Sequence, residues 1–300
     1  MMDQAQALRR LVARKSVEPN EADNRKSTTA GARVITVTSG KGGVGKSNFS
    51  INFALALQEC GLRTLVFDAD IGMANIDVLL GSRATVHLVH VMQQRKSLQD
   101  IIQIGPRGLH YIPGGSGFTD LLDLPTEQLE SFLQQMEALA DRYDVILFDT
   151  GAGLSKETIR FISAADETFV VTTPEPPSIA DAYALIKVVS GMFSDTQFRL
   201  VINRAMDWNE GQQTANKLQS VAQQFLKIEL PTLGYLFDDP LVMQAVKKQM
   251  PFSLLYPDSI VSKQIRQLAQ VYVKGQQQTD HNHNGGVKQF LHKWLRRWSN

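Results

Sequence analysis

The chain of 300 residues contains a single cysteine, Cys60, and this scarcity excludes several classes of protein. One cysteine forms neither a disulfide framework nor a metal knuckle that needs two cysteines. It also lacks the paired cysteines with which iron–sulfur carriers hold a cluster between two chains. Cys60 stands in a helical pattern just before Gly61, where we interpret it as a small packing residue rather than a reactive thiol. A reducing compartment fits this composition.

Long hydrophobic runs and an excess of one charge are also missing. No apolar stretch reaches the roughly 20 residues of a membrane-spanning helix, so we expect a soluble protein. The first 33 residues are polar and basic and lack an apolar core, which argues against a secretory signal. Because the formal net charge is only +1, the field of the whole molecule favours no particular partner, and any basic surface is local.

Composition divides the chain into five segments. Residues 1–15 predict a short helix with a basic face, and residues 16–31 predict a flexible linker rich in polar residues. Residues 32–274 form the body. Residues 275–286 predict a second linker, and residues 287–300 carry a short amphipathic helix.

The body alternates short apolar runs with helical patterns. The predicted strands are 33–39, 64–70, 109–113, 144–150, 167–174, 198–204 and 231–237. The predicted helices lie at about 46–59, 127–141, 178–193, 211–227, 239–249 and 258–274. Nearly continuous apolar strands are typical of a parallel sheet that is buried on both faces. We therefore predict an α/β fold with a doubly wound, mostly parallel sheet flanked by helices, and with ligands at the carboxyl ends of the strands.

A glycine-rich segment joins the first predicted strand to the first predicted helix. Its candidate phosphate-binding residues are Gly40, Lys41, Gly42, Gly43, Val44, Gly45, Lys46, Ser47 and Asn48. Glycines let backbone N–H groups turn towards a phosphate, and a helix N-terminus adds positive potential. In such a loop Lys46 reaches the β- and γ-phosphates, and the hydroxyl of Ser47 binds Mg²⁺. We therefore predict a site for a nucleoside triphosphate and Mg²⁺, with Lys46 as a catalytic residue.

Two other predicted strands end in carboxylates. Four apolar residues precede Asp149, which is the pattern of a Walker B strand. The run 64–70 ends with Asp68 and Asp70. An aspartate at the end of one strand is often only a helix cap, but two such strands beside a phosphate loop favour a metal site. We predict that Asp149 holds Mg²⁺ directly or through water.

The loop sequence SGKGGVGKS, with its additional Lys41, resembles the deviant Walker A motif of the MinD/ParA ATPases of the SIMIBI class. In that family the early lysine reaches the nucleotide of a partner chain. The resemblance implies a homodimer that forms when ATP is bound, in which Lys41 acts catalytically in trans. A cation at this place offsets the charge that spreads over the transferred phosphoryl group.

The segment DADIGMANID resembles the first switch of the same family. This resemblance implies that Asp70 orients or polarises the attacking water and that Asp68 supports the Mg²⁺ shell. Gly151 stands where MinD-type chains usually carry proline. That departure concerns the flexibility of the second switch and removes no ligand.

Asn203 and Arg204 end the predicted strand 198–204. Their position matches that of the family's adenine-recognising asparagine, and an asparagine side chain offers a donor and an acceptor to a base edge. The alternative is an Asx-turn after the strand. The chain contains no NKxD motif of the GTP-binding type. We predict ATP as the nucleotide, in part from the resemblance.

The segment 287–300 is strongly amphipathic and contains no acidic residue. The candidate membrane contacts on its apolar face are Phe290, Leu291, Trp294, Leu295 and Trp298. Basic residues occupy the other face, a pattern typical of helices that lie in an anionic membrane surface. The alternative is a helix that packs against the body. We predict a cytoplasmic protein whose ATP-bound dimer binds the inner face of the cell membrane reversibly through two such helices.

The sequence DQAQALR at residues 3–9 resembles the DQAxxLR motif of the FlhG family, also called YlxH or FleN. These MinD-like ATPases regulate flagellar number and placement. In that family the motif stimulates the GTPase FlhF, and the body contacts flagellar C-ring proteins. The resemblance implies that Gln4, Gln6, Leu8 and Arg9 engage FlhF. A solvated N-terminal helix without a partner is the alternative.

Three other functions compete with this interpretation. A ParA-type partitioning ATPase needs a basic DNA-binding face, which the near-neutral charge does not favour, so we expect no nucleic-acid partner. A division-site MinD shares the body but differs in the N-terminal extension. A nucleotide-gated scaffold with incidental hydrolysis is disfavoured by the presence of Lys46, Asp70 and Asp149.

Overall fold

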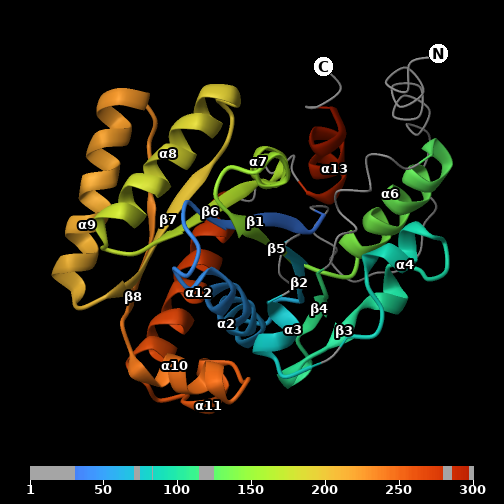
Figure 1. The fold of residues 1–300 in the computed structure, drawn as a ribbon, viewed down its shortest axis with the longest axis horizontal. Coiled ribbons are helices and arrows are strands. Elements are labelled where there is room, and N and C mark those ends of the chain that lie inside the picture. The colour runs from blue at the N-terminus through green and yellow to red at the C-terminus, as the bar shows by residue number, and fades with distance from the viewer. Residues whose placement is uncertain (1–30, 71–74, 83, 115–124, 280–285, 297–300) are drawn as a thin grey trace.

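The computed structural model is built around one sheet, shown in Figure 1, and describes residues 31–70, 75–82, 84–114, 125–279 and 286–296. Within these residues the strands are β1 (Arg33–Ser39), β2 (Thr64–Ala69), β3 (Gln103–Ile104), β4 (His110–Ile112), β5 (Val145–Ala152), β6 (Glu167–Thr172), β7 (Phe198–Ala205) and β8 (Thr232–Phe237). Their order in the sheet is β3-β4-β2-β5-β1-β6-β7-β8. All neighbouring pairs are parallel except β3 with β4, so the predicted α/β fold is confirmed.

Eleven α-helices connect or follow these strands in the described part of the chain. They are α2 (Lys46–Glu59), α3 (Ile76–Leu79), α4 (Leu88–Met92), α6 (Thr126–Ala140), α7 (Lys156–Ala164), α8 (Pro176–Met192), α9 (Trp208–Val221), α10 (Pro240–Lys247), α11 (Phe252–Leu255), α12 (Ile260–Thr279) and α13 (Val287–Arg296). A π-helical turn at Ala222–Leu226 ends α9.

The sequence patterns locate the long helices and miss the short ones. Helices α3, α4, α7 and α11 and the edge strand β3 have no counterpart among the predicted elements. Helix α12 continues to Thr279, so the residues 275–279 that we predicted as linker are helical. The side chain of Arg33 donates a hydrogen bond to Gln276 in this last part of the helix, which ties it to the start of β1.

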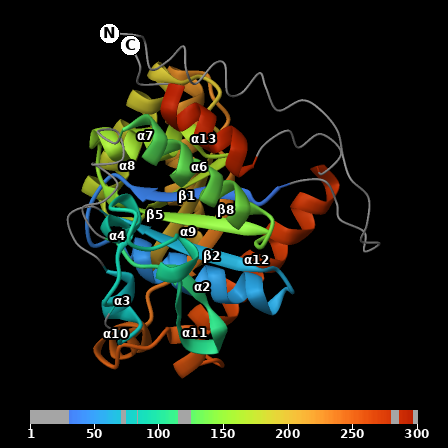
Figure 2. The ribbon, with the colours of Figure 1, turned by 90° about the vertical axis from the view of Figure 1, so that its right-hand side faces the viewer.

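Helices cover both faces of the sheet. Figure 2 shows α6, α7 and α13 on one side and α2 and α12 on the other. On the α2 side, Phe53 packs edge-on against Phe169 of β6 and Tyr272 of α12. Alternate residues of the buried strands point to the two sides, because side chains in a strand alternate. This burial on both faces is the reason the strands are continuously apolar.

Helix α13 forms part of the second layer. Phe290 stacks on Phe148 of β5 with ring centroids 4.9 Å apart, and Trp294 lies beside Phe161 of α7. Phe290, Leu291 and Trp294 are all buried, and Leu295 is partly buried in the same cluster. In this conformation the apolar face that we predicted to contact a membrane is covered by the body, as in the alternative of a packed helix.

Some predictions fall outside the described residues. They are the helix at 1–15 with Gln4, Gln6, Leu8 and Arg9, the linker up to residue 30, the linker residues 280–285, and Trp298. Among the helices that the structure describes, none combines the length and the hydropathy required to cross a bilayer.

Candidate functional site

The glycine-rich loop connects β1 to α2, as the sequence predicts. Gly43 and Gly45 adopt positive φ angles of 81° and 91°, which side chains with a Cβ rarely tolerate. A Cβ on Gly40 would overlap the backbone of Asp181 at the start of α8. These glycines therefore let the loop turn tightly at the N-terminus of α2, where backbone N–H groups and the helix dipole favour a phosphate.

Lys46 and Asp149 face each other at the base of the loop. The Lys46 ammonium lies 3.1 Å from Oδ1 of Asp149, and both side chains are almost completely buried. The hydroxyl of Ser50, one turn further along α2, donates to the same oxygen at 2.8 Å. The second oxygen of Asp149, Oδ2, is buried and has no hydrogen-bond partner among the described residues. An acceptor left in this state fits Mg²⁺ or a water bound to it.

Asp68 of β2 lies in register with Asp149 of β5. Burial, followed by the charge of Asp149, raises the pKa of Asp68 to about 7, although hydrogen bonds from three backbone N–H groups act in the opposite direction. Those donors are the amides of Asp70, Asn75 and Ile76. The implied role of Asp68 in the Mg²⁺ shell stays a prediction, because its oxygens here bind backbone groups.

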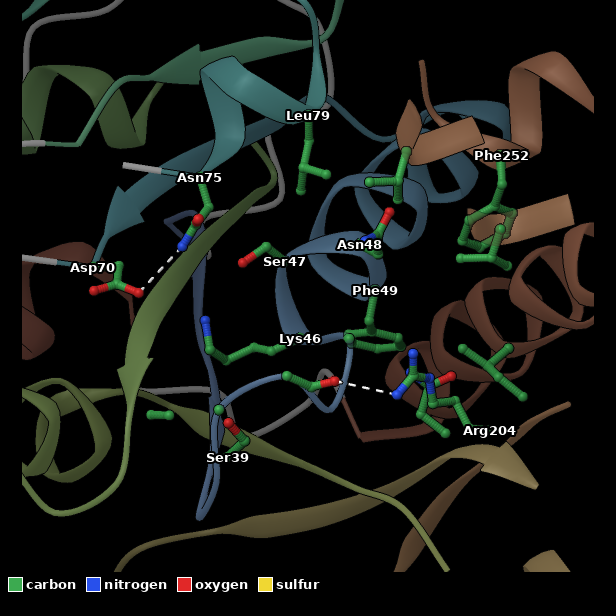
Figure 3. Close-up of a pocket in the computed structure, with 18 of the residues that line it drawn as sticks. Ser39, Lys46, Ser47, Asn48, Phe49, Asp70, Asn75, Leu79, Arg204 and Phe252 are labelled. Carbon is green, nitrogen blue, oxygen red and sulfur yellow. Dashed lines mark hydrogen bonds between the residues drawn. The ribbon is translucent and has the colours of Figure 1, made fainter. Parts of the chain in front are cut away.

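Asp70 follows β2 and lines the same cavity as Ser47 and Lys46, as Figure 3 shows. The side-chain amide of Asn75 donates to Oδ2 of Asp70 at 3.3 Å. Gly151 lies close to this carboxylate, since a Cβ at position 151 would stand 3.4 Å from Oδ1 of Asp70. The glycine that replaces the usual proline thus borders the candidate catalytic carboxylate, Asp70.

Lys41 lies on the outer part of the loop, with its ammonium 3.7 Å from Oε2 of Glu175. Both side chains are largely exposed, at 44% and 61%. The structure contains one chain, so this contact is within the chain, and the predicted action of Lys41 on a partner's nucleotide stays a prediction.

Asn203 and Arg204 approach the loop from the end of β7. The amide nitrogen of Asn203 donates to the carbonyl of Val44 at 2.7 Å, and the guanidinium of Arg204 donates to the carbonyl of Gly43 at 3.4 Å. Arg204 has a φ of 58°, in the left-handed region. Both residues line the cavity, so the structure brings them to the phosphate loop, while base recognition by Asn203 stays a prediction.

The cavity at the carboxyl ends of the strands has a volume of about 1310 Å³. This is large enough for a nucleotide, because small-molecule sites typically measure about 300–1,000 Å³. Its apolar wall includes Phe237 at the end of β8 and Pro240, Val242 and Met243 of α10, which the sequence reasoning missed. The DDPLVM segment after a strand was the available signal, since ligands bind at such strand ends.

The side-chain oxygens that Ser47 and Asp149 offer at this site suit Mg²⁺ better than a transition metal. The described residues contain no group of three His, Cys, Asp or Glu side chains that could hold a metal ion. Mg²⁺ needs no such cage, because one or two protein oxygens, substrate phosphates and water complete its shell. Ser47 and Asp149 can supply those protein oxygens, with the orphaned Oδ2 as the structural support for this assignment.

Comparison with known proteins agrees with this geometry. The model of the CobQ/CobB/MinD/ParA nucleotide-binding domain matches residues 35–252. The chain belongs to the MinD/ParA family. This MinD/ParA chain is 39% identical over 238 residues to the antiactivator FleN of Pseudomonas aeruginosa, an alignment that covers 79% of the chain and 85% of FleN. It is 37% identical over 254 residues to the flagellum site-determining protein YlxH of Helicobacter pylori, with 84% of each protein covered.

A solved relative shares the fold. The septum site-determining protein MinD of Pyrococcus horikoshii, in complex with Mg-ADP, superposes on this MinD/ParA chain with a TM-score of 0.64. The two sequences are 23% identical, and the superposition covers 84% of this chain and 99% of that one.

Proposed function

We propose that the protein is a MinD-like ATPase that controls flagellar number or placement. The observation that carries the ATPase assignment is Lys46 paired with Asp149 at the base of the glycine-rich loop, with Oδ2 of Asp149 left without a partner. The flagellar assignment is supported by the similarity to FleN and YlxH over about four fifths of the chain. ATP and Mg²⁺ as ligands are supported by the Mg-ADP complex of a protein with the same fold.

The proposed reaction is the transfer of the γ-phosphoryl group of ATP to water. The loop N–H groups and Lys46 hold the β- and γ-phosphates, and the carboxylate of Asp70 orients the attacking water. Ser47 would hold Mg²⁺ with its hydroxyl, and Asp149 would hold it directly or through water. When bound there, Mg²⁺ would neutralise charge on the phosphate oxygens. Lys46 must leave Asp149 partly to reach a phosphate, so binding of ATP exchanges one anionic partner of the buried ammonium for another.

We further propose that ATP joins two chains and that Lys41 then acts on the partner's nucleotide. Lys41 is free to move to a new anion because its contact with Glu175 is solvent-exposed, and exposed pairs contribute about 0–1 kcal/mol. Closure of two chains over the nucleotides also excludes water, which strengthens the electrostatic effect of a trans lysine.

Membrane binding by the C-terminal helix requires that α13 leave the body. Besides its aromatic contacts, the docked helix is held by Asp166, whose carboxylate accepts a hydrogen bond from the amide of Gly286 at 3.1 Å, and by an ion pair of Lys293 with Asp195. We propose that the released helices of an ATP-bound dimer insert their apolar faces into an anionic membrane surface. Two helices on one dimer bind more tightly than one, because the second binding is intramolecular.

One experiment tests the ATPase proposal. The purified chain is titrated with ATP and Mg²⁺ in a calorimeter, and phosphate release is followed at increasing protein concentration. We expect binding that requires Mg²⁺ and a specific activity that rises with protein concentration, since a dimer is the active form. Absence of ATP binding in the presence of Mg²⁺ rejects the assignment.

The partner assignment is tested separately. We propose that the N-terminal motif, with Gln4, Gln6, Leu8 and Arg9, stimulates the GTPase FlhF and that the body binds C-ring proteins. GTP turnover by FlhF is measured with the full chain and with a chain that lacks residues 1–15. Equal turnover with both chains excludes the motif as the activator and leaves a MinD-like ATPase without this partner.

A further inference from the structure

Asp68 has neighbours in three parts of the chain near the phosphate site. They are Asp149 of β5, the residues Asp70, Asn75 and Ile76, and Gly114 beyond β4. Asp68 is 1% exposed in β2 and pairs in register with Asp149 of β5. After β2 the chain runs through Asp70 to Asn75 and then enters α3. Asp70 is the candidate catalytic carboxylate, so contacts that fix Asp70 and Asn75 also fix the position of that carboxylate.

The carboxylate of Asp68 binds Asp70 and the start of α3. Its Oδ1 accepts a hydrogen bond from the amide of Asp70 at 3.2 Å. Its Oδ2 accepts hydrogen bonds from the amides of Asn75 at 2.9 Å and Ile76 at 3.2 Å. One buried side chain therefore binds Asp70 on one side and Asn75 and Ile76 on the other, and hydrogen bonds to an ionised carboxylate are stronger than neutral ones.

These contacts orient Asp70. The side chain of Asn75 donates to Oδ2 of Asp70 at 3.3 Å, and Figure 3 shows the two side chains turned towards each other. Because the backbone of Asn75 is held by Asp68, this contact depends on Asp68 as well. The chain of contacts runs from Asp68 through Asn75 to the Asp70 carboxylate.

Gly114, just beyond β4, lies directly against the Asp68 side chain. A Cβ at this position would stand 2.8 Å from Cγ and 3.0 Å from Oδ1 of Asp68, and 3.1 Å from its backbone carbonyl oxygen. Contacts below 3.0 Å do not occur without displacement. The absence of a side chain at position 114 thus leaves the space that the Asp68 carboxylate occupies.

We propose that Asp68 is a positioning residue that clamps Asp70, just after β2, to Asn75 and Ile76 at the start of α3, with Gly114 providing the space for the clamp, and that it is not a Mg²⁺ ligand. A carboxylate has about four acceptor positions, and backbone amides occupy three of them. Asp149, whose Oδ2 has no partner, is the better ligand. The catalytic part of this inference rests on the proposed ATPase function, whereas the clamp itself does not.

The test uses the full chain and two readouts. The first is hydrogen exchange of the backbone amides of Asp70, Asn75 and Ile76, measured without nucleotide at about pH 8 so that the Asp68 carboxyl is ionised. Asp68→Asn keeps the shape but replaces one acceptor oxygen with a donor, so at least one of these amides is released. We expect exchange at the released amide to accelerate about tenfold or more. Gly114→Ala keeps the carboxylate but displaces it, and we expect accelerated exchange of the same amides.

The second readout is steady-state ATP hydrolysis as a function of ATP and Mg²⁺. For Asp68→Asn we expect kcat to fall about tenfold or more, with the KM for ATP and the Mg²⁺ concentration for half-maximal activity changed by less than about twofold. Asp77→Asn is the matched control: this half-buried aspartate also accepts an amide hydrogen bond, from Val78 in α3. We expect it to leave exchange of the same three amides and turnover unchanged.

The outcomes distinguish a failure of the Asp68 clamp from a failure of the proposed ATPase function. Unchanged amide exchange in Asp68→Asn, together with a Mg²⁺ requirement raised about tenfold, overturns the clamp and makes Asp68 a metal ligand. If the unaltered chain hydrolyses no ATP, the proposed function fails, while the exchange measurement still decides the clamp. If Asp68→Asn does not fold, Gly114→Ala decides it instead, and exchange that matches the unaltered chain contradicts the inference.

Discussion

The ammonium of Lys46 and the carboxylate of Asp149 form an ion pair of 3.1 Å in which the two side chains are 8% and 0% exposed. Two ions in such a place are costly to desolvate, and each one needs the other. The pair also holds the two groups at the place where a phosphate and Mg²⁺ are proposed to bind. Stability and function are therefore linked at this contact.

Substitution of either partner of this pair should destabilise the protein. In Lys46→Met or Asp149→Asn one buried charge loses its partner, so we expect the free energy of unfolding to fall by about 3 kcal/mol in each. The double variant should lose less than the sum, because no unpaired charge remains. Urea titrations of the four proteins without nucleotide measure this coupling. Strictly additive losses would show that the two groups do not stabilise each other.

Lys41→Ala should separate ATP binding from hydrolysis. The lysine lies outside the base of the loop, so we expect the affinity for ATP to change by less than about threefold, while turnover falls by about 10³-fold or more, as for other cations supplied in trans. Its specific activity should stay flat as protein concentration rises. Glu175→Gln removes only an exposed partner, and we expect its stability to change by less than about 0.5 kcal/mol. A turnover of Lys41→Ala that still rises with concentration argues against action in trans.

Weakening the docking of α13 should expose the helix to membranes. The guanidinium of Arg160 in α7 lies 6.0 Å from the ring centre of Trp294, a contact worth about 0.5–1 kcal/mol. Arg160→Ala should therefore increase binding to anionic liposomes without ATP by about two- to fivefold in a sedimentation assay. Lys156→Ala, an exposed cation at the start of the same helix, is the control that corrects for the lost charge. Equal binding by both variants would mean that docking does not limit membrane binding.

The raised pKa of Asp68 predicts a pH-dependent stability. The native carboxyl titrates near pH 7, whereas the unfolded one titrates near 3.8. Between these values the native state binds more protons, so the contribution of Asp68 to the free energy of unfolding falls as the pH rises from about 4 to 7. The difference between the unaltered chain and Asp68→Asn should follow this fall, on the order of 2–4 kcal/mol. Denaturation curves from pH 5 to 8 without Mg²⁺ and nucleotide measure it, and a difference that is constant with pH contradicts the assignment.

The phosphate site was predictable because its signals are local. Glycines at 43 and 45 are needed for positive φ angles within one short loop, and the sequence shows them directly. The apolar runs that precede Asp68 and Asp149 were also visible in the sequence, since burial on both faces makes a strand continuously apolar. Short elements such as α7 were not predicted, because nine residues carry too few turns for a clear period.

The position of α13 could not be predicted from its pattern. A helix with an apolar and a basic face suits a membrane surface and a protein groove equally well. Docking of α13 depends on Phe148 and Phe161, which the fold brings from β5 and α7 into contact with Phe290. Those residues are far away in the sequence, and only packing places them together.

The phosphate loop, the parallel sheet and the aspartates near the ends of two strands could be predicted from local patterns, since each depends on residues that are neighbours along the chain. Three contacts were visible only in the folded chain: Asp68 binds the amides of Asp70, Asn75 and Ile76, Asn203 binds the carbonyl of Val44, and α13 packs on the body. These contacts join residues on different elements. Their formation depends on how the layers pack and on which buried polar groups must find a partner, and neither is recorded in a local pattern.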